Sequence, residues 1–162
     1  MPMSKRVKIL IGMALGALWA VLVIWLGPMW KNVGLAAALG LAGFCVGLPL
    51  MAVIGRLAQR RFFDDRIIDG APLTGAAEID GRVLSNTVEQ ALLAACIWPL
   101  AGLVLGSGTV LSLGAGFVLA RLAFWIGYHV SPPLRAFGFA ATFYPTVLAA
   151  LLVLRAGVQL AF

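Results

Sequence analysis

Three polar side chains share one helical face within a long apolar stretch of this sequence. Arg82, Asn86 and Glu89 are spaced by four and then three residues, which places them on the same side of an α-helix. A charged group in membrane hydrocarbon costs at least about 2.5–3.5 kcal/mol, so such groups usually mark a functional site or are paired. The three residues are therefore candidate binding residues.

A second stripe lies in the next apolar stretch. Its members, which share one helical face by their spacing, are Arg121, Phe124, Trp125 and Tyr128. Arg135 lies at the start of the helix expected next in the chain. The first stripe lies at the start of its stretch and the second at the end of the next one. Consecutive spans run in opposite directions, so we expect both stripes on the same side of the membrane, at one depth.

Two interpretations fit these groups. In the first, Glu89 and Arg121 form a buried pair, with Asn86 bonded to a neighbouring donor, that only holds helices together. In the second, an anionic ligand supplies negative charge that the chain lacks. Glu89 is the only acid expected within the helices, and it is outnumbered by Arg82, Arg121 and Arg135. Because guanidinium groups bind carboxylates through paired hydrogen bonds, this excess favours the ligand.

The elements that must position these residues are transmembrane helices. Of the 162 residues, 62% are hydrophobic and 11% charged, well above the roughly 45–50% apolar content of soluble domains. Five stretches are long enough to span a bilayer, and they cover residues 9–27, 33–55, 84–105, 110–128 and 137–160. The first two should be antiparallel neighbours because a very short turn joins them. The polar segment 56–81 between the second and third is expected to be a structured loop or a helix extension.

The distribution of basic residues predicts the orientation. Lys and Arg gather before the first stretch, around the polar segment and near the 130–133 turn, as expected of cytoplasmic segments. The amino terminus is therefore expected to be cytoplasmic, and the net charge of +6 indicates orientation, not a nucleic-acid partner. The Ala- and Gly-rich composition fits a bacterial inner membrane.

Other residues have a structural interpretation. Pairs of glycines four residues apart allow close helix packing, and they are Gly12/Gly16, Gly43/Gly47 and Gly102/Gly106. Prolines within the apolar stretches should kink or locally unwind their helices, and they are Pro49, Pro99 and Pro145. Cys45 and Cys96 lie in apolar runs and His129 is the single histidine, so neither a disulfide nor a metal site is expected.

The two polar stripes together resemble the MAPEG family, the membrane-associated proteins of eicosanoid and glutathione metabolism. The resemblance rests on RVLSNTVE (82–89), ARLAFWIGY (120–128) and Arg135, and it covers residues 33–162. The implied fold is an all-α, polytopic membrane helical bundle. Family members usually have four helices, so residues 1–32 would form one additional N-terminal transmembrane helix and turn before a four-helix domain.

The resemblance also implies a function. It implies a homotrimer in the bilayer that binds glutathione as co-substrate between subunits, with Arg82, Asn86, Glu89, Arg121 and Tyr128 as binding residues. Arg135 would be the catalytic residue, since it matches an arginine held near the glutathione sulfur. A cation there lowers the thiol pKa and favours the nucleophilic thiolate. The implied reaction is conjugation or reduction of a lipophilic electrophile.

Two positions depart from the family pattern, and two other functions remain open. Gln90 and Phe124 stand where some members have a tyrosine, which favours a non-catalytic trimeric scaffold as the first alternative. The second is a small membrane transporter in which Glu89 responds to protons or cations. The resemblance also leads us to expect an arginine from the end of the second helix in the site, and the candidates are Arg56, Arg60 and Arg61.

Overall fold

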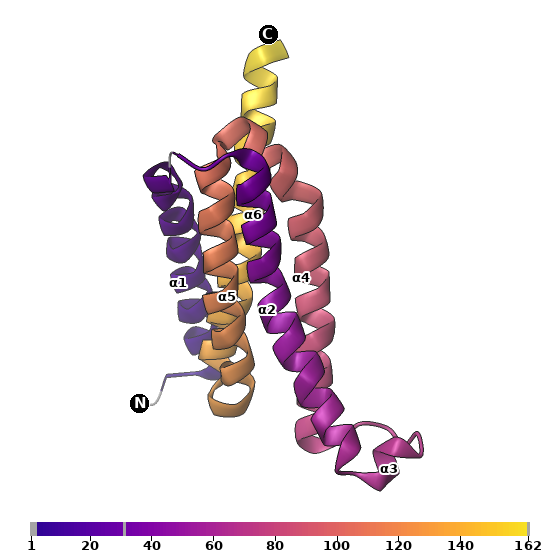
Figure 1. The fold of residues 1–162 in the computed structure, drawn as a ribbon. Coiled ribbons are helices and arrows are strands. Elements are labelled where there is room, and N and C mark those ends of the chain that lie inside the picture. The colour runs from indigo at the N-terminus through magenta and orange to yellow at the C-terminus, as the bar shows by residue number, and fades with distance from the viewer. Residues whose placement is uncertain (1–2, 31, 162) are drawn as a thin grey trace.

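The computed structural model describes residues 3–30 and 32–161, and these form an all-α bundle of five long helices (Figure 1). No strand occurs within the described ranges. The elements are α1 (Lys5–Leu26), the 3-10 helix η1 (Gly27–Trp30), α2 (Leu35–Phe62), the short α3 (Asp65–Ile68), α4 (Gly75–Leu105), α5 (Ser107–Val130) and α6 (Pro132–Ala161).

Each of the five predicted membrane spans corresponds to a helix, and each helix is longer than hydropathy alone indicated. Each of α1, α2, α4, α5 and α6 is long and apolar enough to cross a membrane. The largest difference is at α4, which begins at Gly75 instead of residue 84. Hydropathy detects the part of a helix that suits hydrocarbon, whereas the backbone hydrogen bonds of α4 continue into the polar sequence beyond it.

The polar segment between the second and third spans is mostly a helix extension. α2 continues to Phe62, and Asp64 caps α3 by accepting a hydrogen bond from the Arg66 backbone N–H. Gly70 and Gly75 then adopt φ values of +89° and +57°, a region that glycine occupies without steric cost. These turns return the chain into α4, so that α2 and α4 run side by side past the bundle (Figure 1).

The expectation that the first two spans are neighbours is wrong. In the described residues α1 packs mainly on α6 and also on α5, and it makes no contact with α2 (Figure 1). The reason is close packing: a Cβ on Gly12 would overlap the Pro133 carbonyl, and one on Gly16 would overlap Ala140. The predicted small-residue contact therefore exists, but it joins the first and last helices.

The remaining glycine and proline predictions have mixed outcomes. Gly102 packs closely against Leu35 and Val110, while Gly43 and Gly47 face open space in the single chain. α2, α4 and α6 continue as helix through their prolines, so the predicted local unwinding does not occur, while the alternative, a kink, stays a prediction. Cys45 is half-buried and Cys96 is exposed, and both are free cysteines.

The core is divided into two clusters along the bundle. The larger lies towards the end distant from α3 and includes Trp98 and Phe117, whose rings meet edge to face at 6.1 Å. The smaller consists of Val53, Leu57, Val83 and Phe124. It packs against Trp125 and Tyr128, so it supports the end of the bundle where the predicted polar residues lie.

Candidate functional site

The guanidinium of Arg121 is the centre of the predicted polar group. Arg121 belongs to α5, and its side chain is 1% exposed where α5 faces α4. It donates hydrogen bonds to Asn86 Oδ1 at 2.9 Å and to Thr87 Oγ1 at 2.8 Å, and its Cζ lies 4.0 Å from the Phe124 ring centroid. A buried charge is costly unless hydrogen-bonded. These contacts compensate for part of the burial of Arg121, while its Nε has no hydrogen-bond partner among the described residues.

Asn86 links Arg121 to Glu89. Its Nδ2 donates to Glu89 Oε2 at 3.1 Å, while its Oδ1 accepts from Arg121. Glu89 itself is exposed, and within the described residues it forms no ion pair with Arg121. The interpretation of a direct, buried Glu89–Arg121 pair is therefore wrong, because Asn86 lies between them and Glu89 faces outward.

Arg82 lies one turn before Asn86 and already has a partner. It forms an ion pair with Glu78 at 2.6 Å, with 63% and 48% of the two side chains exposed. Glu78 was placed in the loop by hydropathy but belongs to the first turns of α4. The excess of positive charge is consequently smaller than the sequence indicated. Among the described residues, Arg121 and Arg135 are the site arginines without a carboxylate within 4.0 Å, and of these two Arg121 is buried.

Arg135 lies on the first turn of α6 and is held against α5. Its guanidinium Cζ is 4.8 Å from the Tyr128 ring centroid, a cation–π distance. α5 and α6 approach closely here, because a Cβ on Gly127 would overlap the Arg135 backbone and one on Gly138 would overlap Phe124. The two glycines therefore determine where Arg135 and Tyr128 meet.

Two hollows open on either side of Asn86. The first, of about 530 Å³, is lined by polar residues that include Arg82, Asn86 and Glu89. The second, of about 470 Å³, is lined by Asn86, Tyr128 and Arg135 together with apolar side chains. The structure thus brings five of the six predicted residues to adjoining surfaces, and the sixth, Arg121, supports Asn86 from beneath.

A second buried polar cluster was not predicted. Asp80 is 1% exposed, its Oδ2 accepts from Arg60 Nε, and its Oδ1 accepts from Trp125 Nε1 at 2.8 Å. His129 Nε2 lies 3.9 Å from the same Oδ1.

The expectation that Glu89 is the only acid within the helices is wrong, since Asp80 is more deeply buried. The helical spacing of Thr87 and Val83, continued backwards, leads to Asp80 and could have revealed it.

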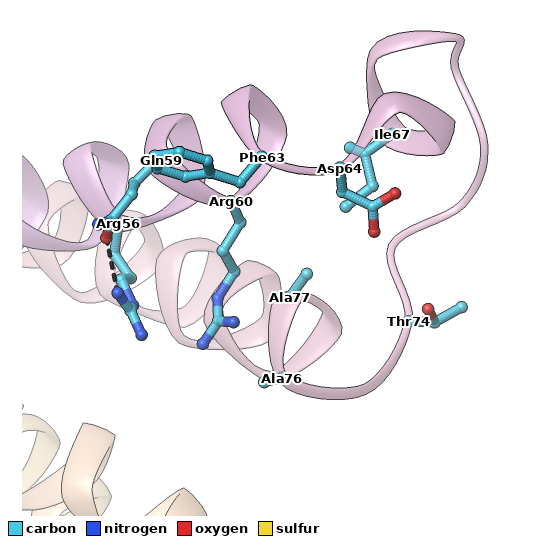
Figure 2. Close-up of a pocket in the computed structure, with 9 residues that line it drawn as sticks. All are labelled: Arg56, Gln59, Arg60, Phe63, Asp64, Ile67, Thr74, Ala76 and Ala77. Atoms are coloured by element: carbon cyan, nitrogen blue, oxygen red, sulfur yellow. Dashed lines mark hydrogen bonds between the residues drawn. The ribbon is translucent and has the colours of Figure 1, made fainter.

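The arginines at the end of α2 do not join the hollows beside Asn86 in the single chain. Figure 2 shows Arg56 and Arg60 extending from α2 towards Ala76 and Ala77 of α4. They line a separate pocket of about 350 Å³, and Arg56 is hydrogen-bonded to Gln59 at 2.6 Å. Arg61 is exposed.

These features define a class of protein. The chain is a multi-pass helical membrane protein with a cluster of arginine, asparagine and glutamate side chains at one end of its bundle. No group of three or more His, Cys, Asp or Glu side chains in the described part of the chain is arranged to hold a metal ion.

The family assignment follows from the sequence comparison. The model of the MAPEG family matches residues 33–155, which is most of the chain and includes both polar stripes. The chain belongs to the MAPEG family, and α1 lies outside the matched region. Comparison with curated proteins and with solved structures gives no significant match.

Proposed function

We propose that this protein binds glutathione and uses its thiolate to attack lipophilic electrophiles that reach the site from the bilayer. The observation that carries this proposal is Arg135, a cation that lines a largely apolar hollow and is stacked on Tyr128. It has no carboxylate partner among the described residues. A cation with spare donors beside an apolar space suits a thiolate that reacts with an apolar molecule.

The neighbouring hollow suits the charged parts of the tripeptide. Glu89 is exposed and could pair with an ammonium group, while Arg82 has guanidinium donors left over from its pair with Glu78. Asn86 lines both hollows, and Arg121 fixes the orientation of its amide. Charge-assisted hydrogen bonds of this kind are about twice as strong as neutral ones.

The chemistry requires little more than a stabilised thiolate. The thiol loses its proton to solvent, and the guanidinium of Arg135 stabilises the remaining sulfur charge, which lowers the thiol pKa. The sulfur then forms a bond to the electrophilic carbon, and a leaving group departs with the electron pair of the bond that breaks. With a hydroperoxide the sulfur attacks the terminal oxygen instead: an S–O bond forms as the O–O bond breaks, and the departing alkoxide takes a proton from solvent to become an alcohol. A second glutathione thiol then attacks the resulting sulfenic acid, which gives glutathione disulfide and water.

The proposed assembly is a homotrimer. Both hollows are open in the single chain, and a neighbouring subunit would close the site and enclose glutathione. With the amino terminus in the cytoplasm, the site would lie near the cytoplasmic face. We further propose a bacterial inner membrane as the location.

The first experiment tests binding. The thermal stability of the detergent-purified protein is measured with and without millimolar glutathione, because a ligand at 100 times its dissociation constant adds about 2.7 kcal/mol to the native state. Arg82→Ala should lose the shift, and Arg66→Ala, at an exposed arginine of α3, should keep it. Absence of a shift in the wild type would rule out the glutathione proposal.

A second experiment tests the role of Arg135. Difference absorbance in the ultraviolet reports the thiolate of bound glutathione. Arg135→Ala should remove most of this signal while glutathione still binds, whereas Arg155→Ala, near the far end of α6, should retain it. Equal signals in both variants would show that Arg135 does not stabilise the sulfur.

The scaffold function is the second candidate, and a specific observation favours it. Phe124 and Gln90 are both buried, and the Phe124 ring packs against Arg121 and meets Tyr128 edge to face at 5.2 Å. These two positions therefore serve packing and offer no hydroxyl to a ligand. A trimer without any glutathione-induced stabilisation would support the scaffold. The transporter is less favoured, since Glu89 faces outward.

A further inference from the structure

Helix α1 lies outside the family match yet borders the candidate site. The matched residues begin at 33, whereas α1 ends at Leu26. Met13 of α1 nevertheless lines the same hollow as Asn86, Tyr128 and Arg135. The helix that distinguishes this chain from the family match thus contributes a side chain to the hollow that carries the proposed catalytic residue.

The position of Met13 relative to Arg135 is set by tight packing. The adjacent Gly12 lies so close to the start of α6 that a Cβ would overlap the Pro133 carbonyl. One turn later Gly16 packs against Ala140 in the same way. Further along, the rings of Trp19 and Phe137 meet edge to face with centroids 6.4 Å apart. α1 is therefore fixed against the helix that carries Arg135.

The hollow has a polar side and an apolar side. Arg135 and Asn86 form the polar side, while Met13, Phe124 and Phe139 contribute apolar surface. Met13 and Phe139 are each 37% exposed on membrane-spanning helices, so the apolar side is open towards lipid. Methionine is flexible and polarizable, which suits contact with apolar groups of varied shape.

We propose that α1 forms the apolar wall of the site and that Met13 contacts the extended apolar chain of the electrophile. This inference rests on the proposed function, because it assigns a place to the second substrate of that reaction. An electrophile with a long alkyl chain would lie with its reactive carbon near Arg135 and its chain between Met13 and Phe139. Short or strongly polar electrophiles would gain little from this wall.

The test uses S-hexyl glutathione, which joins the tripeptide to an alkyl chain at the sulfur. Its affinity and that of glutathione are measured by calorimetry on the full-length protein in detergent. Burial of alkyl groups is favourable, so Met13→Ala should weaken S-hexyl glutathione about fivefold and leave glutathione within about twofold. Met13→Leu should retain the affinity. Leu18→Ala, an exposed position on the same helix, is the matched control.

The outcomes separate the inference from the proposed function. If the wild type binds both compounds and Met13→Ala behaves like Leu18→Ala, the inference that Met13 contacts the alkyl chain is wrong, and the proposal of glutathione binding is retained. If Met13→Ala weakens both compounds equally, Met13 acts on the site as a whole and the alkyl contact is also overturned. If the wild type binds neither compound, the proposed function fails, and the inference with it.

Discussion

Two polar clusters lie near each other on α4, one around Asp80 and one around Asn86 and Glu89. They differ in how many of their polar groups are hydrogen-bonded or ion-paired within the chain. Both carboxylate oxygens of Asp80 accept hydrogen bonds from α2 and α5, and the side chain is buried. Glu89 is exposed and accepts one hydrogen bond, from Asn86. Arg135, across the hollow from Asn86, has no carboxylate partner among the described residues.

The difference indicates separate roles. A buried carboxylate with both oxygens hydrogen-bonded to neighbouring helices joins three helices. An exposed group of charges contributes little to stability. Here the Arg82–Glu78 pair and the Asn86–Glu89 hydrogen bond still leave donors and acceptors for a charged molecule. The saturated cluster is therefore architectural, and the open one is the candidate site.

The largest expected effect is at the saturated cluster. Asp80→Ala leaves Arg60 and Trp125 without their acceptor, and breaking a buried pair by removal of one partner typically costs about 3–5 kcal/mol. Because Arg60 is partly exposed, we expect a loss of about 3 kcal/mol of unfolding free energy. Unfolding with sodium dodecyl sulfate in mixed micelles measures it. Asp69→Ala, at an exposed aspartate, is the control, and similar values for the two variants would contradict the comparison.

The next effect concerns the packing that places Arg135. Gly127→Ala adds a Cβ where the Arg135 backbone lies, and overpacking of this kind costs about 1–3 kcal/mol. We expect about 2 kcal/mol, by the same unfolding assay, and loss of the bound thiolate signal. Gly157→Ala, where a Cβ meets open space, should change neither. A normal thiolate signal in Gly127→Ala would show that the close approach is not required.

Arg121 combines properties of both clusters: its side chain is buried, like that of Asp80, but it is hydrogen-bonded to Asn86 of the exposed cluster. Arg121→Met retains most of the volume and removes the hydrogen bonds to Asn86 and Thr87. We expect a loss of about 1 kcal/mol of unfolding free energy, together with a weaker stabilisation by glutathione because Asn86 is no longer oriented. Arg61→Met, at an exposed position, is the control. An unchanged glutathione shift would leave Arg121 with a purely structural role.

The smallest effect on stability is expected at Glu89. Glu89→Gln keeps an acceptor for Asn86 and removes the charge, so unfolding should change by less than about 0.5 kcal/mol. Glutathione affinity should fall about tenfold, because a charge-assisted hydrogen bond becomes a neutral one. Calorimetry measures the affinity. A stability loss comparable with that of Asp80→Ala would mean that the two clusters do not differ.

The sequence predicted the membrane spans and the polar stripes well, because both depend on local properties. Long apolar stretches identify the spans, and the spacing of Arg82, Asn86 and Glu89 places them on one face of α4 whatever surrounds that helix. The family resemblance was confirmed over residues 33–155. The roles assigned to individual residues towards glutathione stay predictions.

The failures share a physical cause. Hydropathy indicated that α4 began near residue 84, so Glu78 and Asp80 were assigned to a loop and the charge excess was overestimated. The pairing of Arg82 with Glu78 and of Arg60 with Asp80 depends on helix turns and neighbours that lie outside the apolar stretches. A pattern of apolar residues contains no information about these partners.

The sequence by itself determined that this is an all-α membrane protein with five spans and a cationic end, because the bilayer demands long apolar helices and selects the side of basic segments. The tertiary structure decided that α1 packs on α6, that Asn86 separates Glu89 from Arg121, and that Asp80 is saturated while Arg135 is not. Those outcomes depend on which small residues allow two helices to approach, and such contacts become visible only when the bundle is assembled.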